Sequence, residues 1–178
     1  MYKASKQTVR HYYKYQYKTF NQPTLTQNNY LGGDLFAVAA EYEYYNTYWA
    51  YHGLDSTGWL GNQALNWYVF YNPNPLKVTN LTFSQISNNY IQKYDLYGSN
   101  DNSTWTKIGS YNQGSGTVSN DISNSTYYNY YKIQATSYAT RTAFCNLIIT
   151  ADEKYSVEST SSDYDFYKDV DEYKAFNI

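Results

Sequence analysis

A predicted β-hairpin between Tyr94 and Ile108 constrains the fold of this chain more than any other feature. The segment reads Y-D-L-Y-G-S-N-D-N-S-T-W-T-K-I, which is a strand, a polar turn and a second strand. Tyr94, Leu96 and Gly98 recur at a period of two, so they share one face of the first strand. The alternation predicts a half-buried strand that needs a sheet to lie in.

The turn of this hairpin has the residues that reverse a chain. The side chains of Asn100 and Asp101 can hydrogen-bond to their own backbone, and Asn102 tolerates a positive φ angle. The run from Thr104 to Ile108 then returns to residues that favour β-strands. We therefore expect a tight antiparallel connection here.

Short β-prone segments separated by polar turns continue along most of the chain. The segment Asn72–Pro75 (N-P-N-P) is expected to end a strand, and Gly109–Asn120 is expected to be a loop rich in Gly, Ser and Asn. This texture predicts an all-β sandwich. The other expected strands are Ala37–Glu41, Leu65–Tyr71, Leu76–Phe83, Tyr127–Ala135 and Ala143–Thr150.

Charge divides the 178 residues into three expected parts. Residues 1–30 carry five bases and no acid, and residues 31–151 carry seven acids and five bases. Residues 152–178 carry eight acids and three lysines. We expect a basic N-terminal arm, a sandwich and an acidic tail in these ranges. Opposite charge at the two ends suggests that they meet partners, or each other across subunits, although two solvated tails would show the same pattern.

The N-terminal arm contains a strand pattern with one aromatic face. Tyr13, Tyr15 and Tyr17 alternate with polar residues, and Gln22-Pro23 breaks the pattern. A strand of this length is not stable alone. It must therefore lie against the sandwich, a neighbouring copy or a larger assembly.

The acidic tail shows helical spacing instead. Ser162 is a plausible N-cap, with acidic residues in the turn that follows. The spacing predicts a short amphipathic helix whose apolar face docks on an assembly partner. That face consists of Phe166, Val170, Tyr173 and Phe176.

Composition argues against several classes of protein. A net charge of −2 and a pI of about 5.6 argue against nucleic-acid binding. With Cys145 as the single cysteine, no intrachain disulfide can form, and the longest apolar run, Leu35–Ala40, is too short to span a bilayer. We see no secretory signal and expect a protein that is not exported by itself. The 26 tyrosines suit contact surfaces, but an AT-rich genome would also produce them.

Three segments carry a family resemblance. They are A-Y-H-G-L-D-S-T-G-W (Ala50–Trp59), G-S-N-D-N-S-T-W (Gly98–Trp105) and Y-Y-N-Y-Y-K-I (Tyr127–Ile133). Together they resemble the discoidin, or coagulation-factor C-type, family, which includes many galactose-binding-like carbohydrate-binding modules. The resemblance implies a jelly-roll β-sandwich over residues 31–151. Core packing is the expected role of Trp59, Trp67 and Trp105, which match family positions or strand positions.

The resemblance fails at the position of a structural calcium. In the family, an aspartate at the position of His52 and a glutamate near the position of Asn146 commonly hold the ion. Histidine is a poor ligand for a hard cation, and Asp55 and Thr57 alone would make a weak site. We expect no tightly bound metal and no cofactor.

Glycan-binding members of this family use loops at one end of the sandwich. A sugar stacks its C–H face on an aromatic ring while polar side chains fix its hydroxyls. Arg141 is the most interesting candidate, being one of two arginines in the chain. The full set of loop candidates is Tyr44, Tyr45, Tyr48, Asn88, Asn89, Tyr90, Tyr138 and Arg141.

No catalytic motif is visible, so we expect a protein that is not an enzyme. The motif S-N-D-x-S-T-W of this chain resembles that of discoidin-like modules in phage structural and fibre proteins. This favours a virion protein of the capsid surface, tail or fibre, assembled in the host cytoplasm. Its expected partners are other virion proteins and copies of itself, with host or mucosal glycans at the loops, and neither nucleic acid nor membrane insertion. A carbohydrate-binding module of a bacterial glycan-degrading system is the alternative.

Overall fold

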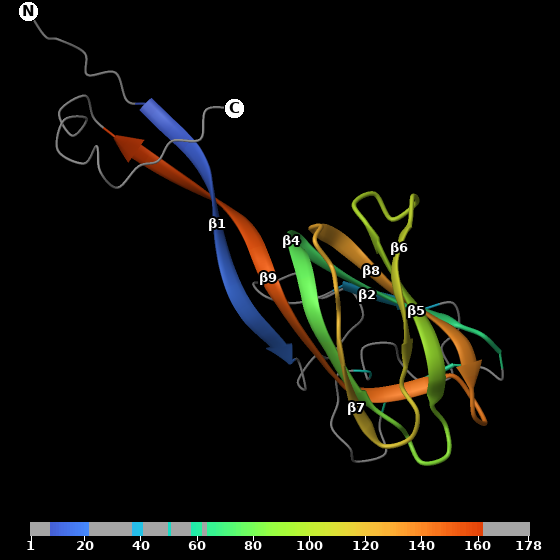
Figure 1. Ribbon diagram of the computed structural model, residues 1–178. Helices are drawn as coiled ribbons and strands as arrows, with labels where there is room; N and C mark the ends of the chain where they lie inside the picture. Colours follow the sequence, from blue (N-terminus) through green and yellow to red (C-terminus); the bar gives the residue numbers. More distant parts are fainter. Residues whose placement is uncertain (1–7, 22–36, 41–49, 51–57, 62–63, 162–178) are drawn as a thin grey trace, which may run out of the picture.

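The computed structural model describes residues 8–21, 37–40, 50, 58–61 and 64–161, and these form an all-β sandwich with a protruding ribbon (Figure 1). The expected fold class is confirmed. The described residues contain no α-helix and therefore no helix long and apolar enough to cross a membrane. The strands are β1 (Thr8–Asn21), β2 (Ala37–Ala40), β3 (Trp59–Leu60), β4 (Trp67–Ser84), β5 (Ile91–Ser99), β6 (Thr106–Asn112), β7 (Thr117–Asp121), β8 (Tyr128–Tyr138) and β9 (Ala143–Ser161).

The long strand β4 joins the two layers of the sandwich. Its first part, Trp67–Tyr71, pairs with β2 and β8, and its second part, Leu76–Ser84, pairs with β7 and β9. The register shifts between Tyr71 and Leu76, so the segment Asn72–Pro75 is a bulge at which β4 changes partners. The expectation that N-P-N-P ends a strand was therefore wrong: the two prolines bend one strand without breaking it.

Aromatic side chains from both layers fill the core. Trp59, Tyr68 and Phe144 are almost completely buried and lie within 5.4 Å of one another, measured between ring centroids. Phe70 stacks on Tyr131 with centroids 5.3 Å apart. The expected core role holds for Trp59, whereas Trp67 and Trp105 are half-buried.

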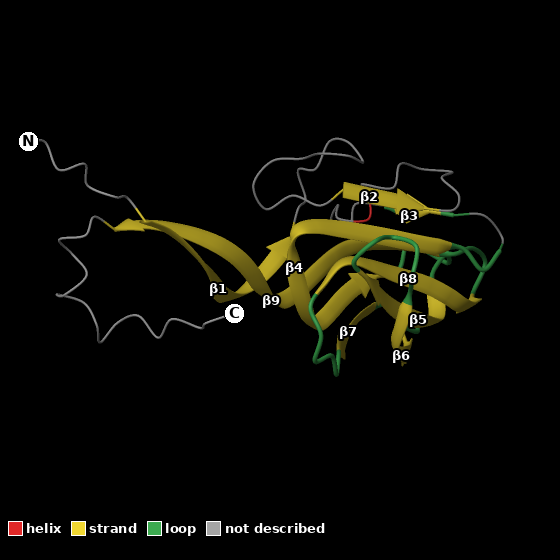
Figure 2. Cartoon of the chain, turned by 90° about the horizontal axis from the view of Figure 1, so that it is seen from above, coloured by secondary structure: helices red, strands yellow, loops and turns green. Residues whose placement is uncertain are grey.

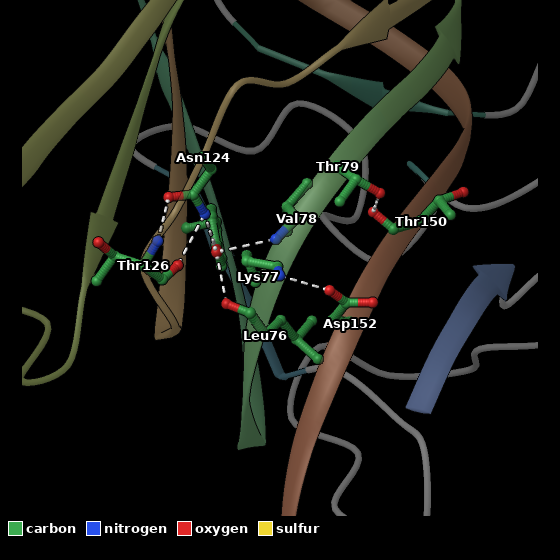
Figure 3. Close-up of polar contacts among 9 residues, drawn as sticks. Leu76, Lys77, Val78, Thr79, Asn124, Thr126, Thr150 and Asp152 are labelled. Atoms are coloured by element: carbon green, nitrogen blue, oxygen red, sulfur yellow. Dashed lines mark hydrogen bonds and ion pairs between the residues drawn. The ribbon is translucent and has the colours of Figure 1, made fainter. Parts of the chain in front are cut away.

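The Tyr131 hydroxyl of β8 holds β4 directly after the bulge, at Leu76 and Val78, which Figure 3 labels. Its oxygen donates a 2.6 Å hydrogen bond to the carbonyl of Leu76 and accepts one of 3.2 Å from the amide of Val78. The side-chain amide of Asn124 donates a third bond of 3.0 Å. On the outer side of β4, Lys77 forms an ion pair of 2.6 Å with Asp152 on β9. The bend in β4 is thus held by specific contacts on both sides.

The predicted hairpin is confirmed as β5 and β6. Tyr94, Leu96 and Gly98 are buried on one face, as the alternation predicted. Gly98 is required there, since a Cβ atom would lie 2.2 Å from Cδ2 of Tyr128. The expected loop at Gly109–Asn120 was wrong, because β6 continues to Asn112 and β7 begins at Thr117.

β1 and the second half of β9 form a two-stranded ribbon that leaves the sandwich (Figures 1 and 2). The register pairs Thr8 with Ser161 and Asn21 with Ile148, so the described parts of the basic arm and the acidic tail pair within one molecule. The boundary expected between residues 151 and 152 falls inside β9. The predicted helix at Phe166–Phe176 lies outside the described residues and stays a prediction.

A buried carboxylate anchors the ribbon. Glu153 is 1% exposed and accepts hydrogen bonds of 2.6 Å from Gln16 on β1 and 2.9 Å from Asn74 in the bulge. The Lys18 ammonium lies 3.9 Å from the same carboxylate. Phe20 of β1 belongs to the main hydrophobic core. The C-terminal part of the N-terminal arm is therefore part of the sandwich.

Candidate functional site

Five of the eight sugar-binding candidates lie on two adjacent connections at one end of the sandwich. Asn88, Asn89 and Tyr90 belong to the turn between β4 and β5, Tyr138 is the last residue of β8, and Arg141 follows it before β9. In Figure 1 these connections lie at the lower right, far from the free end of the ribbon. The remaining candidates, Tyr44, Tyr45 and Tyr48, lie outside the described residues.

The β4–β5 connection is a tight two-residue turn. Ile86 and Asn89 form an isolated antiparallel bridge, with backbone hydrogen bonds of 3.0 and 2.9 Å in the two directions. Ser87 takes a φ of 52° at the first central position, a conformation that most side chains disfavour. The bridge holds the exposed Asn88 at the tip of the turn and the half-buried Asn89 beside it.

Backbone pairing joins this turn to the end of β8. The Ala139 amide donates a 3.0 Å hydrogen bond to the Tyr90 carbonyl, and Tyr138 lies opposite Ile91 in the register. One step further in, the Ser137 hydroxyl donates a 2.6 Å bond to the side chain of Gln92. The two groups of candidates are therefore neighbours on one surface, although about 50 residues separate them in the sequence.

A third segment borders the same end. The Gly61 amide donates a 2.8 Å hydrogen bond to the Thr142 carbonyl, and the Thr142 hydroxyl donates to the Ala64 carbonyl. Leu65 is 50% exposed beside these contacts. This fixes the connection between β8 and β9, which carries Arg141, from its C-terminal side.

Sequence reasoning missed the β6–β7 connection, which completes this end. The Gln85 amide donates a 3.0 Å bond to the Gly116 carbonyl, and the Gln113 amide donates a 2.9 Å bond to the Gln92 carbonyl. Gly114 and Gly116 have φ angles of 66° and 83°. The sequence G-S-G at residues 114–116 is typical of such a short turn. The prediction of one loop over Gly109–Asn120 did not use this signal.

The side chains at this end suit a neutral, hydroxyl-rich ligand. Tyr90 and Tyr138 offer half-exposed rings, and Asn88 and Asn89 each offer an amide donor and acceptor. Arg141 offers a permanently charged guanidinium with several donors. The described residues of this end include neither a histidine nor a carboxylate. The arrangement supplies groups for binding and orientation, with no acid–base pair.

The described residues include only one of the positions that correspond to the family's calcium site. His52, Asp55 and Thr57 lie outside the described residues. Asn146 is half-buried within β9 with a φ of 52°. Among the described residues, no group of three or more metal-ligating side chains lies together. The expected lack of tight calcium binding stays a prediction.

The matches to known proteins agree with the observed fold. A family model described as the F5/8 type C domain matches residues 36–148. The chain has no match among curated protein sequences. Among solved structures, it is similar to an F5/8 type C domain from Bacteroides fragilis, with 12% identity and a TM-score of 0.59, covering 75% of this chain and 95% of that one.

Two further similar structures are carbohydrate-binding modules from Clostridium perfringens. One is the family 32 module of NanJ in complex with galactose, with 15% identity and a TM-score of 0.55 over 65% of this chain and 93% of that one. The other is a CpGH89 module in complex with GalNAc-β-1,3-galactose, with 18% identity and a TM-score of 0.57 over 64% and 94%. At these identities the similarity concerns the fold.

Proposed function

Because the chain belongs to the F5/8 type C domain family, we propose that it is a non-enzymatic structural protein of a phage virion that binds glycans through the end of its sandwich. The observation that carries the sugar-binding part is the convergence of Asn88, Asn89, Tyr90, Tyr138 and Arg141 on one surface. The ribbon of β1 and β9 would hold the protein in the particle. Other virion proteins and copies of itself would be its partners there.

Chemistry and fold both support a glycan ligand. Similar folds from C. perfringens were solved with galactose and with GalNAc-β-1,3-galactose. In this chain, tyrosine rings provide stacking surfaces and the asparagines and Arg141 provide donors and acceptors, which are the groups a sugar needs. We therefore propose galactose-containing glycans as the first class of ligand to test.

The proposed virion role is supported by the separation of the candidate sugar-binding loops from the ribbon along β9. β9 starts at the candidate sugar-binding end with Ala143 and finishes at the tip of the ribbon with Ser161. Attachment at one end and recognition at the other is the layout that a surface-exposed particle protein needs. The exposed tyrosines Tyr13, Tyr15 and Tyr17 give the ribbon a contact face.

A carbohydrate-binding module of a bacterial glycan-degrading system is the second candidate. The observation that favours it is the origin of the similar folds, one of which is a module of a family 31 glycoside hydrolase. In that case sugar recognition would be the main task, and the ribbon would pack on another domain instead of a virion.

A glycan array with two arginine variants tests the sugar-binding end. Arg141→Ala should reduce the signal on galactose-containing glycans by at least about tenfold, which corresponds to the loss of one charged hydrogen-bonding partner. Arg10→Ala removes the only other arginine, on the exposed ribbon, and is the matched control. Absence of binding by the wild-type chain to every glycan would overturn the sugar-binding proposal.

Mass spectrometry of particles purified from the source culture tests the virion role. We expect this chain in stoichiometric amount. A version that lacks residues 1–15 keeps Gln16, Lys18 and Phe20, which contact the sandwich, and should fold but no longer join the particle. Absence of the chain from every particle would favour the bacterial module.

A further inference from the structure

No strand among the described residues pairs with the outer edge of β1. In the described part of the chain, β1 pairs with β9 and with no other strand, and it lies at the end of the sheet order. All 14 residues from Thr8 to Asn21 form one uninterrupted register with β9. Every second residue of such an edge strand directs its backbone N–H and C=O groups away from the sheet. β1 is thus a template for one more strand.

The free half of the ribbon has little support of its own. Beyond Glu153, β9 pairs only with β1 among the described residues, so the ribbon there consists of two strands. Two-stranded ribbons are at best marginally stable in water, whereas three or more strands with an apolar face are stable. The ribbon therefore gains from an additional strand.

One face of β1 carries a continuous row of tyrosines. Tyr13, Tyr15 and Tyr17 are 53%, 59% and 68% exposed, and they alternate along the strand, so they share a face. Tyr15 touches Tyr127 with ring centroids 5.7 Å apart, and the Lys154 ammonium lies 3.9 Å from the centroid of Tyr13. These contacts leave most of the row's surface in water.

We propose that two copies of this chain pair β1 edge to edge, antiparallel, about a two-fold axis at Tyr15. The register then places Tyr13 opposite Tyr17 of the second copy and Tyr15 opposite its counterpart, so the six rings form three cross-strand pairs. Aromatic cross-strand pairs are among the stabilising pairs of antiparallel sheets. The result is a four-stranded sheet in the order β9, β1, β1, β9.

The charges of β1 are compatible with this register and disfavour the two registers next to it. Arg10, Lys14 and Lys18 lie on the other face of the strand, with no acid among residues 8–21. A two-fold axis at Lys14 would place that lysine opposite its own copy, and an axis at Gln16 would place Lys14 opposite Lys18. Both arrangements set like charges against each other. The axis at Tyr15 places Lys14 opposite Gln16 and Lys18 opposite Tyr12, so no two cations lie opposite each other.

This pairing has a consequence for the whole molecule. Antiparallel β1 strands put the two sandwiches on opposite sides of the two-fold axis: Asn21 lies opposite Val9 of the second copy, so the two Asn21 residues are about 40 Å apart at 3.3 Å per residue. Since β9 runs from the loop end to the ribbon tip, both loop ends point outward, away from the two-fold axis. The inference concerns the ribbon and does not depend on sugar binding.

Cysteine cross-linking in the full chain tests the pairing and its register. In a Cys145→Ala background, Tyr15→Cys should form an intermolecular disulfide under mild oxidation, because residues opposite at the axis bring their Cβ atoms to about 5 Å. Tyr13→Cys mixed with Tyr17→Cys should also cross-link, and neither should cross-link with itself. Thr19→Cys, on the same face but opposite His11, is the negative control.

Light scattering coupled to size exclusion tests the dimer without cysteines. The wild-type chain should be a dimer, and Tyr15→Lys, which sets two lysines opposite each other, should raise the dimer dissociation constant at least about tenfold. Circular dichroism should show that the variant keeps its sheet content, since Tyr15 is 59% exposed. A monomeric wild type, a trimer, or a dimer that Tyr15→Cys leaves uncross-linked would each overturn the proposal, whatever the glycan array shows.

Discussion

Tyrosine has two opposite roles in this protein, and burial of the hydroxyl separates them. Tyr131 is fully buried, and its hydroxyl serves two backbone groups of β4 and the amide of Asn124. Burial raises the pKa of Tyr131 well above its ordinary value near 10, so the hydroxyl keeps its proton as a donor. Tyr15, in contrast, presents its ring to water. The sequence makes no distinction between the two.

Tyr131→Phe should destabilise the fold by about 1–3 kcal/mol, because the carbonyl of Leu76 and the amide of Val78 lose their buried partner. Chemical denaturation monitored by tryptophan fluorescence measures the change. Tyr97→Phe is the matched control, since the Tyr97 hydroxyl has only a 3.4 Å bond to Asp95, and it should change stability by less than about 0.5 kcal/mol. Equal effects of the two variants would contradict the structural role of the Tyr131 hydroxyl.

Asp101 organises the turn between β5 and β6. Its Oδ1 accepts hydrogen bonds of 2.7 Å and 2.8 Å from the amides of Thr104 and Ser103, and a 2.9 Å bond from the Ser99 hydroxyl. Asn102 takes a φ of 57°, as its tolerance for that region predicted. Asn100 accepts a bond from the amide of Asn129 on β8 instead of capping its own turn.

The backbone bonds from Thr104 and Ser103 hold the pKa of Asp101 well below its ordinary value near 3.8. A lowered folded-state pKa means that the carboxylate stabilises the fold in full above about pH 4. The contribution falls as the pH drops further and is lost below the folded-state pKa. Asp101→Ala should therefore lower the melting temperature at pH 7, and the gap to wild type should narrow between pH 4 and pH 2. A gap that is independent of pH would contradict this account.

The position of His52 predicts weak calcium binding in place of a tight site. An imidazole where the family commonly has a carboxylate removes a hard oxygen ligand and its charge. Isothermal titration of calcium into chelator-treated protein should give no binding tighter than about 10⁻⁴ M, the range of weak extracellular sites. His52→Asp is the variant in which affinity should rise. Tight binding by the wild type would contradict the prediction.

At the scale of elements, β9 determines the shape of the molecule. Its 19 residues pair with β3 at Phe144, with β4 from Cys145 to Glu153 and with β1 up to Ser161. The sequence suggested a strand that ended at Thr150, because the acidic run that follows is typical of a solvated tail. The strand continues because Gln16, Lys18 and Asn74 surround the carboxylate of Glu153.

Glu153→Ala should loosen β1 from the sandwich. The variant leaves the donors of Gln16 and Asn74 without their acceptor, at a cost of about 1–3 kcal/mol. Hydrogen exchange should show faster exchange of β1 amides and unchanged protection in β5 and β8. Glu158→Ala, whose carboxylate is 68% exposed beside His11, is the control and should leave β1 protected. Equal protection of β1 in both variants would contradict the anchoring role.

The local pattern predicted the strands well and their connections poorly. The alternation in β5 and the turn residues around Asp101 act through neighbours in sequence, so they are readable without the fold. The N-P-N-P segment is different. Proline lowers the tendency to pair, but β4 continues after it because the Tyr131 hydroxyl and the Lys77–Asp152 ion pair hold the segment Leu76–Val78, directly behind the bulge. Those contacts come from residues more than 50 positions away.

At the scale of the whole molecule, the two candidate interaction surfaces lie along different parts of β9. Loop residues near Ala143 form one surface, and the ribbon centred on Tyr15, which pairs with Lys154, forms the other. Substitutions at sites this far apart, with no shared partner, should act independently. The proposed dimer also presents its two sugar-binding ends in opposite directions.

The wild-type chain should therefore agglutinate beads coated with a galactose-containing glycan, because one dimer can bridge two surfaces. Tyr15→Lys should abolish agglutination and leave the dissociation constant for the soluble glycan within about twofold of wild type. Arg141→Ala should abolish agglutination and raise the dissociation constant for the soluble glycan at least about tenfold. Agglutination that survives Tyr15→Lys would show that the ribbon does not provide the bivalency.

The sequence alone determined the all-β class, the β5–β6 hairpin and the family, because alternation, turn chemistry and short motifs depend on residues close together in the chain. It also named five residues that the fold brings to one end of the sandwich. Only the tertiary structure decided that β4 bends without ending, that the oppositely charged ends pair as a ribbon, and that Glu153 is buried at its base. Pairing between β1 and β9 joins residues about 130 to 150 positions apart, and no local pattern records which distant partner a strand will find.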